Sequence, residues 1–222
     1  VRAIEELGNG FLDGALIERL RGDDGACRAY YQEVLMVVYR IIFMLFEEQR
    51  GMLGGGGDHG VLFLEEYSIT SLRERVDAFE GRDDRNTDLW EGLSVTFRML
   101  EEGVPELGVN AFDGMLFSND GARFLKDAKC RNTALMNAIR SLTWTVSETG
   151  GRRQRGHGRQ RISYADLSVE EIGAIYESLL DYTPRITTGF EEVNGREYRP
   201  GQFMLDPRGS ERKTTGSYYT NP

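Results

Sequence analysis

One apolar run constrains the fold more than any other part of the sequence. In residues 34–46, thirteen positions in succession, Arg40 is the only side chain that is neither apolar nor aromatic. A helix that is apolar on all sides is buried in a protein core or embedded in a membrane. Thirteen residues interrupted by an arginine are too few to cross a bilayer, and we expect no stretch long enough to span one. The run therefore predicts the central helix of a bundle, within a helix over residues 28–49 that Gly51 ends.

Shorter helical patterns flank the central helix. In each of them apolar residues recur at helical spacing between polar, glycine or proline breaks. The expected helices cover residues 4–20, 71–79, 87–102 and about 132–146. In the first of these segments, Gly8, Gly10 and Gly14 lower the helix propensity. Together the segments predict a mainly α fold, a multi-helix bundle with a small β-hairpin element near the C-terminus.

A further helix is predicted after residue 167. Ser168 and Glu171 have the spacing of a capping box, in which each side chain accepts a hydrogen bond from the other residue's backbone N–H. Apolar residues then recur with helical period until Pro184, which cannot continue a helix. The favoured interpretation is that this helix is purely a packing element; the alternative is an indirect role, in which it sets the direction in which the following segment leaves.

Strand structure is expected only near the C-terminus. Asn194-Gly195 between two short β-prone runs is the strongest short hairpin signal, and residues 202–205 are a candidate third strand. All β structure should therefore lie within about residues 187–205. The expected organisation is a helical domain over residues 1–183, a hairpin linker over 184–209, and the start of another domain over 210–222.

Charge is distributed unevenly along the chain. The net charge of −9 by itself argues against a general nucleic-acid binder. Residues 1–149 carry 16 basic and 26 acidic side chains, whereas residues 150–222 carry 11 and 10. A DNA-facing surface would therefore lie in the last third of the chain.

The most basic segment is the glycine-rich stretch 150–161. It contains one histidine, no acid and five arginines, which are Arg152, Arg153, Arg155, Arg159 and Arg161. Its glycines and polarity favour a solvated loop, since charge runs usually only keep a segment in water. The same arginines are also suited to contact the phosphate backbone of DNA. Both interpretations stay open at the level of the sequence.

The sequence contains no recognisable catalytic or metal-binding constellation. Cys27 and Cys130 are too few for a disulfide framework and indicate a reducing, cytoplasmic setting. With two histidines beside them, neither a zinc-ligand spacing nor a catalytic triad is readable. Residues 55–60 match G-x-G-x-x-G formally, but they follow a helix rather than a strand, which predicts a loop rather than a phosphate-binding turn. Neither a secretory signal nor membrane association is expected.

Three blocks of the sequence resemble a known enzyme family. Residues 212–220 read Arg-Lys-Thr-Thr-Gly-Ser-Tyr-Tyr-Thr and are similar to the R-K-x-T-G-S-Y-Y-T-P segment that opens the catalytic domain of N6-adenine DNA methyltransferases. Residues 161–182 resemble the block that precedes this domain in fused restriction–methylation (type IIG-like) enzymes and in phage-exclusion (BREX-type) methyltransferases. Residues 110–117 resemble the family's N-G-G-L-F loop.

The resemblance implies that the chain is the helical connector just before a methyltransferase core. It would be a fragment of a longer parent, since it starts at Val1 and ends within the motif. The residues that would line the pocket for S-adenosylmethionine, a cofactor bound only by the full-length parent, are Thr215, Gly216, Tyr219 and Thr220. Asn221 departs from the family, which has proline directly after that threonine. The implied partners are double-stranded DNA and the other modules of the same protein.

Catalysis itself is not expected of this chain. An adenine methyltransferase needs a glycine-rich turn for the cofactor and an Asn/Asp-Pro-Pro-Tyr/Phe motif for the flipped adenine, and the sequence has neither. The acidic cluster and lysine of a metal-dependent nuclease are not readable either. The alternative function is a helical protein-interaction or scaffold domain without a DNA role. The sequence beyond Pro222 would separate the two, because only a methyltransferase continues into the missing motifs.

Overall fold

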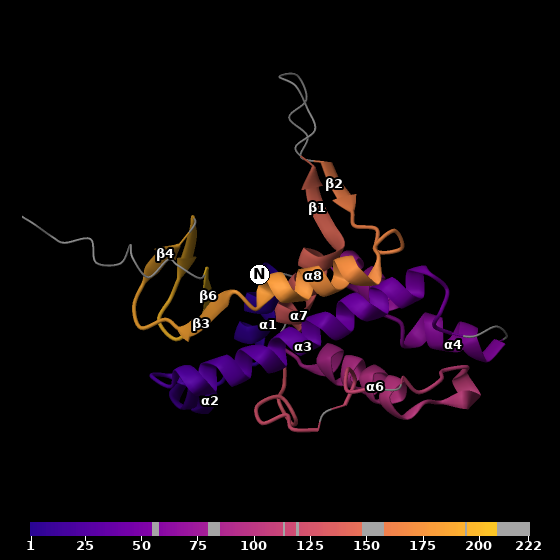
Figure 1. The fold of residues 1–222 in the computed structure, drawn as a ribbon, viewed down its shortest axis with the longest axis horizontal. Helices are drawn as coiled ribbons and strands as arrows, with labels where there is room; N and C mark the ends of the chain where they lie inside the picture. The colour runs from indigo at the N-terminus through magenta and orange to yellow at the C-terminus, as the bar shows by residue number, and fades with distance from the viewer. Residues whose placement is uncertain are drawn as a thin grey trace, which may run out of the picture.

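The computed structural model describes residues 1–54, 58–79, 85–112, 114–118, 120–147, 158–193 and 195–207. Within these ranges the chain is mainly helical, with small antiparallel strand pairs toward the C-terminus, which confirms the predicted fold class (Figure 1). The helices are α1 (Arg2–Gly10), α2 (Gly14–Leu20), α3 (Asp24–Gln49), α4 (Asp58–Glu66), α5 (Ile69–Ala78), α6 (Asp88–Glu102), α7 (Asn132–Thr143) and α8 (Val169–Leu179), with a 3-10 turn η1 (Pro105–Leu107). The strands are β1 (Trp144–Ser147), β2 (Gly158–Arg161), β3 (Tyr182–Ile186), β4 (Glu191–Val193), β5 (Arg196–Tyr198) and β6 (Phe203–Pro207).

The apolar run forms the central helix, as predicted. Asp23 caps α3 by accepting a hydrogen bond from the backbone N–H of Ala26 at 2.8 Å. At 26 residues α3 is longer than the run, and by length and composition alone it is apolar enough to cross a membrane, so the expectation that no stretch reaches that length was wrong. However, 67% of its most apolar window is buried inside the protein, as in the core helix of a soluble protein.

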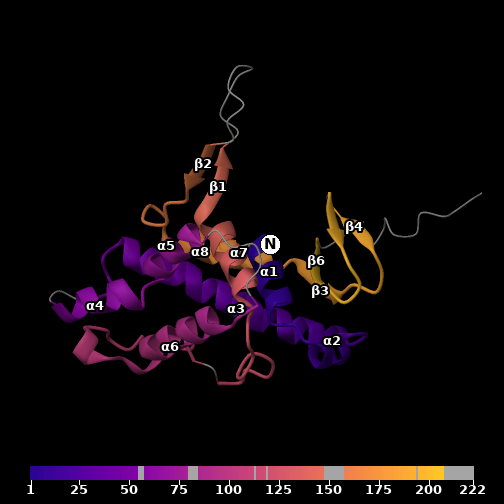
Figure 2. The ribbon, with the colours of Figure 1, turned by 180° about the vertical axis from the view of Figure 1, so that it is seen from behind.

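Helices from both ends of the chain pack around α3. α1 and α5 contact both α3 and α7. α8 lies along α3, where the rings of Tyr39 and Tyr176 are 5.2 Å apart and the hydroxyl of Tyr31 donates to the carbonyl of Leu179. In Figures 1 and 2, α8 is on one side of α3 and α6 on the other. One hydrophobic core joins these helices to β3 and β6.

One predicted helix is divided in the structure, and one helix was not predicted. The segment 4–20 is two helices rather than one, because Asp13 starts α2 by accepting a hydrogen bond from the backbone N–H of Leu16 at 2.7 Å. α4 was not predicted; it begins at Asp58, directly after the glycine-rich stretch. The helices expected over 71–79 and 87–102 are confirmed as α5 and α6.

The capping box of α8 is confirmed in full. The Ser168 hydroxyl accepts from the backbone N–H of Glu171 at 3.1 Å, and the Glu171 carboxylate accepts from the backbone N–H of Ser168 at 2.7 Å. These hydrogen bonds hold the pKa of Glu171 below its usual value. The preceding loop is tied to the end of α3, because the side-chain oxygen of Gln49 accepts from the backbone N–H groups of Tyr164 (2.7 Å) and Ala165 (3.1 Å). The direction of α8 is therefore set by contacts at its start.

The β structure is more extensive than predicted. The Asn-Gly hairpin is confirmed as β4 paired with β5, and Gly195 has the positive φ (+74°) that such a turn requires. The third strand exists as β6, but it pairs with β3, whose first two residues were expected to belong to the helical domain. Pro184 lies within β3; a two-stranded pair tolerates it because one edge of β3 has no partner strand in the described part of the chain.

The end of α7 also differs from the prediction. The predicted helix continued to about residue 146, whereas α7 ends at Thr143 and β1 follows at once. Residues 144–146 are Trp, Thr and Val, which favour strands, and β2 supplies the partner. The expectation that all β structure lies within residues 187–205 was therefore wrong.

Candidate nucleic-acid interface

Most residues of the sequence-predicted sites lie outside the described part of the chain. The expected cofactor-binding residues there are Thr215, Gly216, Tyr219 and Thr220, and the expected DNA-binding residues there are Arg152, Arg153 and Arg155. Arg159 and Arg161 are described, and both belong to β2. The end of the predicted basic loop is thus a strand.

A two-stranded ribbon carries these two arginines. β1 pairs with β2 in an antiparallel register that places Trp144 opposite Arg161 and Val146 opposite Arg159. The ribbon stands away from the helical body in both views (Figures 1 and 2). It continues directly from α7, and the carbonyl of Thr143 accepts from the backbone N–H of Ile162 at 2.9 Å, which closes its base. The ribbon is therefore rooted in a packed helix.

Arg161 is held at the base of the ribbon by two neighbours. Its guanidinium lies over the ring of Trp144, 5.3 Å from the centroid, and 3.6 Å from a carboxylate oxygen of Asp77 on α5. The indole N–H of Trp144 donates to the same carboxylate at 3.0 Å. The Arg161 side chain remains 51% exposed. Asp77 orients both side chains, so Arg161 presents a positioned and partly neutralised charge.

A recess of about 710 Å³ opens at the foot of the ribbon. We call it the ribbon recess, and it is lined by Arg2, Asp77, Phe79, Asn137, Arg140, Ser141, Trp144 and Thr145. Sequence reasoning did not identify it. A partial signal was available: Asn137 and Ser141 have the i, i+4 spacing of one face of the predicted helix, away from its apolar stripe. What the sequence does not show is that α1 and α5 complete the recess.

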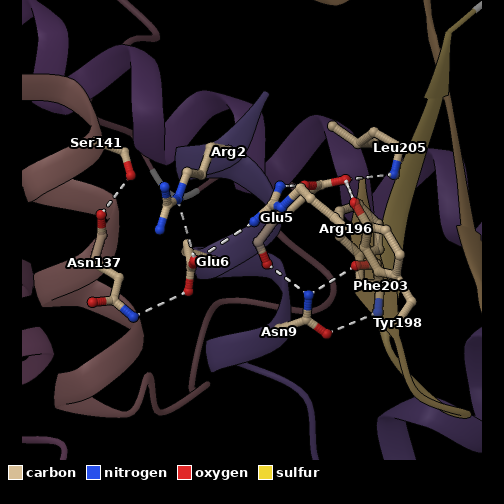
Figure 3. Close-up of polar contacts among 10 residues, drawn as sticks. All are labelled: Arg2, Glu5, Glu6, Asn9, Asn137, Ser141, Arg196, Tyr198, Phe203 and Leu205. Carbon is tan, nitrogen blue, oxygen red and sulfur yellow. Dashed lines mark hydrogen bonds and ion pairs between the residues drawn. The ribbon is translucent and has the colours of Figure 1, made fainter. Parts of the chain in front are cut away.

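A buried carboxylate joins α1 to the C-terminal strands (Figure 3). Glu5 is 3% exposed. Its two oxygens accept from the hydroxyl of Tyr198 and the backbone N–H of Leu205, each at 3.1 Å, and pair with the guanidinium of Arg196. The first helix therefore fixes β5 and β6.

Asn9, one turn further along α1, adds a second attachment to β6. Its amide nitrogen donates to the carbonyl of Phe203 at 2.8 Å, and its amide oxygen accepts from the backbone N–H of the same residue at 2.9 Å (Figure 3). The backbone N–H and C=O of Phe203 are thus both hydrogen-bonded, as they would be to a neighbouring strand. The path of the chain up to residue 207 is thus anchored to the helical body.

A larger cavity of about 1000 Å³ lies between α3, α6 and the loop that follows η1. The loop is fastened by two side chains of α3: Glu33 accepts from the backbone N–H groups of residues 123–125, and Arg40 donates to the carbonyls of Leu116 and Ser118. Phe117 is buried, and its ring lies 5.9 Å from that of Phe43. The cavity lining has four basic and four acidic residues, so its charge indicates no class of ligand.

The described residues offer no arrangement for a metal ion. No group of three His, Cys, Asp or Glu side chains in that part of the chain is placed to hold one. Both cysteines are buried, and burial raises the pKa of Cys27 to about 11 and that of Cys130 to about 12. Such thiols are poor nucleophiles and poor metal ligands at neutral pH.

Comparison with known proteins leaves the sequence resemblance without independent support. No protein-family model matches the chain, and neither a curated protein nor a solved structure is significantly similar to it. An assignment to adenine methyltransferases therefore rests on the three sequence blocks.

Proposed function

We propose that the chain is the helical connector of a site-specific, S-adenosylmethionine-dependent DNA adenine-N6 methyltransferase of the restriction–modification (type IIG-like) or BREX type. The proposed setting is cytoplasmic. In this proposal the connector does not catalyse; it holds the segment with Thr215, Gly216, Tyr219 and Thr220 at the edge of the cofactor pocket. The remaining modules of the same protein complete that pocket and bind double-stranded DNA.

One observation supports this proposal more than any other. The β1–β2 ribbon and the C-terminal strands lie on the same side of α3 (above it in both Figure 1 and Figure 2). The chain reaches residue 207 on β6, which Glu5 and Asn9 anchor to α1. A basic ribbon and a rigid exit toward residue 208 on one side of the body suit a connector that faces DNA on the side where the catalytic domain is attached.

The test has a sequence part and a chemical part. Translation of the parent gene beyond Pro222 should show a glycine-rich motif and an Asn-Pro-Pro-Tyr-like motif within about 200 residues, the size of one domain. The full-length protein with methyl-labelled S-adenosylmethionine and duplex DNA should then form N6-methyladenine. Replacement of the motif's asparagine by alanine should abolish the label. If both motifs and methylation are missing, the scaffold alternative is favoured instead.

The basic arginines provide a separate prediction. In the full-length protein, changing Arg152, Arg153, Arg155, Arg159 and Arg161 together to alanine should weaken binding to specific and random duplexes to a similar extent. The reason is that arginines bound to phosphates read no sequence information. The slope of log affinity against log salt should become shallower by about 0.9 for each phosphate that the variant no longer neutralises. Fluorescence anisotropy across a salt series measures both quantities.

Arg98→Ala serves as the control, because Arg98 is an exposed arginine on α6, on the far side of α3 from the ribbon (Figure 1). It should leave the salt slope unchanged. An unchanged affinity and salt slope in the five-residue variant would leave the arginines as a solvating segment and contradict the proposed role.

A further inference from the structure

We propose that the ribbon recess binds one unpaired nucleotide of a DNA strand, with the base against the indole of Trp144 and the phosphate on the guanidinium groups of the lining. The inference rests on the proposed function only in taking DNA as the ligand. It goes beyond that function, because it assigns a binding site in the described part of the chain and specifies an unstacked nucleotide rather than a duplex.

The aromatic lining suits a base. Trp144 and Phe79 both border the recess, and Phe79 is 36% exposed. Exposed aromatic faces bind unstacked bases of any sequence, because every base has a π-face. Inside a duplex those faces are already stacked, so an indole in a recess is accessible only to a base that has left the stack.

Arg140 is pre-oriented for an anion. It lies on α7, and its guanidinium donates to the carbonyls of Val76 (2.6 Å) and Phe79 (3.2 Å) at the end of α5. Both of these bonds leave from the same terminal nitrogen, and a guanidinium has five N–H groups on three nitrogens. The Arg140 guanidinium is therefore held in one orientation at the border of the recess, and its other two nitrogens are not used by these two bonds.

The charges around the recess leave a small positive surplus. Arg2 borders it from α1, and its side chain is 68% exposed. Glu6 lies 3.7 Å from Arg2 and accepts from the amide of Asn137 at 3.3 Å (Figure 3). Asp77 already accepts from Trp144 and pairs with Arg161. The lining itself has two guanidinium groups, those of Arg2 and Arg140, and one carboxylate, that of Asp77, on a chain whose net charge is −9. This balance fits a single phosphate.

The hydrogen-bonding groups of the recess match a nucleotide as well. Asn137, Ser141 and Thr145 contribute an amide and two hydroxyls beside the aromatic and basic groups. Such groups serve the edges of a base and the oxygens of a sugar. The volume of about 710 Å³ is within the range of small-ligand sites, which is about 300–1,000 Å³.

The experiment titrates the 222-residue chain with four probes: a short oligo(dT) strand, the same strand in a duplex, dTMP and inorganic phosphate. Binding is followed by tryptophan fluorescence and by anisotropy of a labelled strand. Trp90 is 7% exposed and hydrogen-bonded to the loop carbonyl of Ala128, so quenching reports on Trp144. We expect the single strand to bind more tightly than the duplex or inorganic phosphate and to quench the signal, and we expect dTMP to quench it as well.

The variants separate stacking from charge. Trp144→Leu should weaken strand binding about tenfold, the loss of one stacked base. Trp144→Phe should keep most of the affinity, because a ring remains, while the quenching disappears. Arg2→Glu should weaken binding and make the salt slope shallower by about 0.7, the value for one phosphate of a single strand. Arg98→Glu makes the same charge change far from the recess and should alter the slope less than Arg2→Glu does. Circular dichroism checks that each variant is folded.

Three results would overturn the inference: unchanged affinity in folded Trp144→Leu, equal effects of Arg2→Glu and Arg98→Glu, or duplex or inorganic phosphate binding as tight as the single strand. No outcome depends on S-adenosylmethionine or methylation. A parent protein without methyltransferase activity would therefore refute the proposed function while the recess could still bind the strand. Conversely, a methylating parent whose recess variants bind normally would refute only the site proposed here.

Discussion

Replacing Glu5 by alanine is expected to lower the free energy of unfolding by about 3 kcal/mol. The side chain is almost fully buried, and its carboxylate satisfies the hydroxyl of Tyr198, the backbone N–H of Leu205 and the charge of Arg196 (Figure 3). Alanine would leave two buried donors without an acceptor and one guanidinium without its nearest counter-charge. An unmade buried hydrogen bond costs more than a made one contributes, so the loss should be large.

Glu6→Ala is the matched control, because Glu6 is the next residue of the same helix and also lies beside Arg196. Its contacts are longer, 3.8 Å to Arg196 and 3.7 Å to Arg2, and its side chain is 22% exposed. The expected loss is about 0.5 kcal/mol, as for a partly exposed ion pair. Urea denaturation of both variants followed by circular dichroism measures the difference. Equal losses would show that Glu5 contributes no more than a surface carboxylate.

The parts of the fold that could be predicted are those specified by neighbouring residues. The uninterrupted apolar run identifies α3, the Ser168–Glu171 spacing identifies the start of α8, and Asn194-Gly195 identifies the β4–β5 hairpin. In each case the stabilising interactions lie within a few residues of sequence. These signals therefore remain readable without knowledge of the tertiary structure.

The parts that could not be predicted depend on residues far apart in the sequence. β3 becomes a strand because β6 lies beside it, and the pairing places Pro184 opposite Leu205, although proline is normally a sign against a strand. Likewise β1 exists because β2 returns to pair with it. The strand propensity of residues 144–146 is a local signal, but it is too weak on its own to mark where the helix ends.

In the candidate site, too, local features could be predicted and features that depend on distant residues could not. The arginines of the basic segment are visible in the sequence, but their neighbours are not. Asp77 meets Arg161 and Trp144 only after α5 and α7 pack together, and Arg2 reaches the recess only from α1. The burial of Glu5 is equally non-local, since its partners lie at residues 196–205. Sequence patterns therefore predicted the arginines of the basic segment without predicting the recess at the foot of the ribbon.

The second large effect on the free energy of unfolding is expected for Gly8→Ala in α1. By helix propensity alone, Gly8→Ala should stabilise the protein, because alanine favours a helix more than glycine does. We expect the opposite, a loss of about 2 kcal/mol, because the new Cβ would lie 2.4 Å from a ring carbon of Phe203. That ring is fully buried and packs edge-on against Tyr30 with 5.4 Å between centroids, so it has no space to move. The close approach of α1 to β6 requires glycine at this position.

Gly92→Ala in α6 is the control without a steric clash, because an added Cβ there meets nothing within 4 Å. Propensity should then act alone and raise the free energy of unfolding by about 0.7 kcal/mol. The same chemical change is thus expected to have opposite signs in two helices of one protein, and urea denaturation of the two variants side by side measures both. A stabilised Gly8→Ala variant would mean that Phe203 moves freely. In that case the attachment of β6 to α1 would depend on the hydrogen bonds of Glu5 and Asn9 rather than on packing.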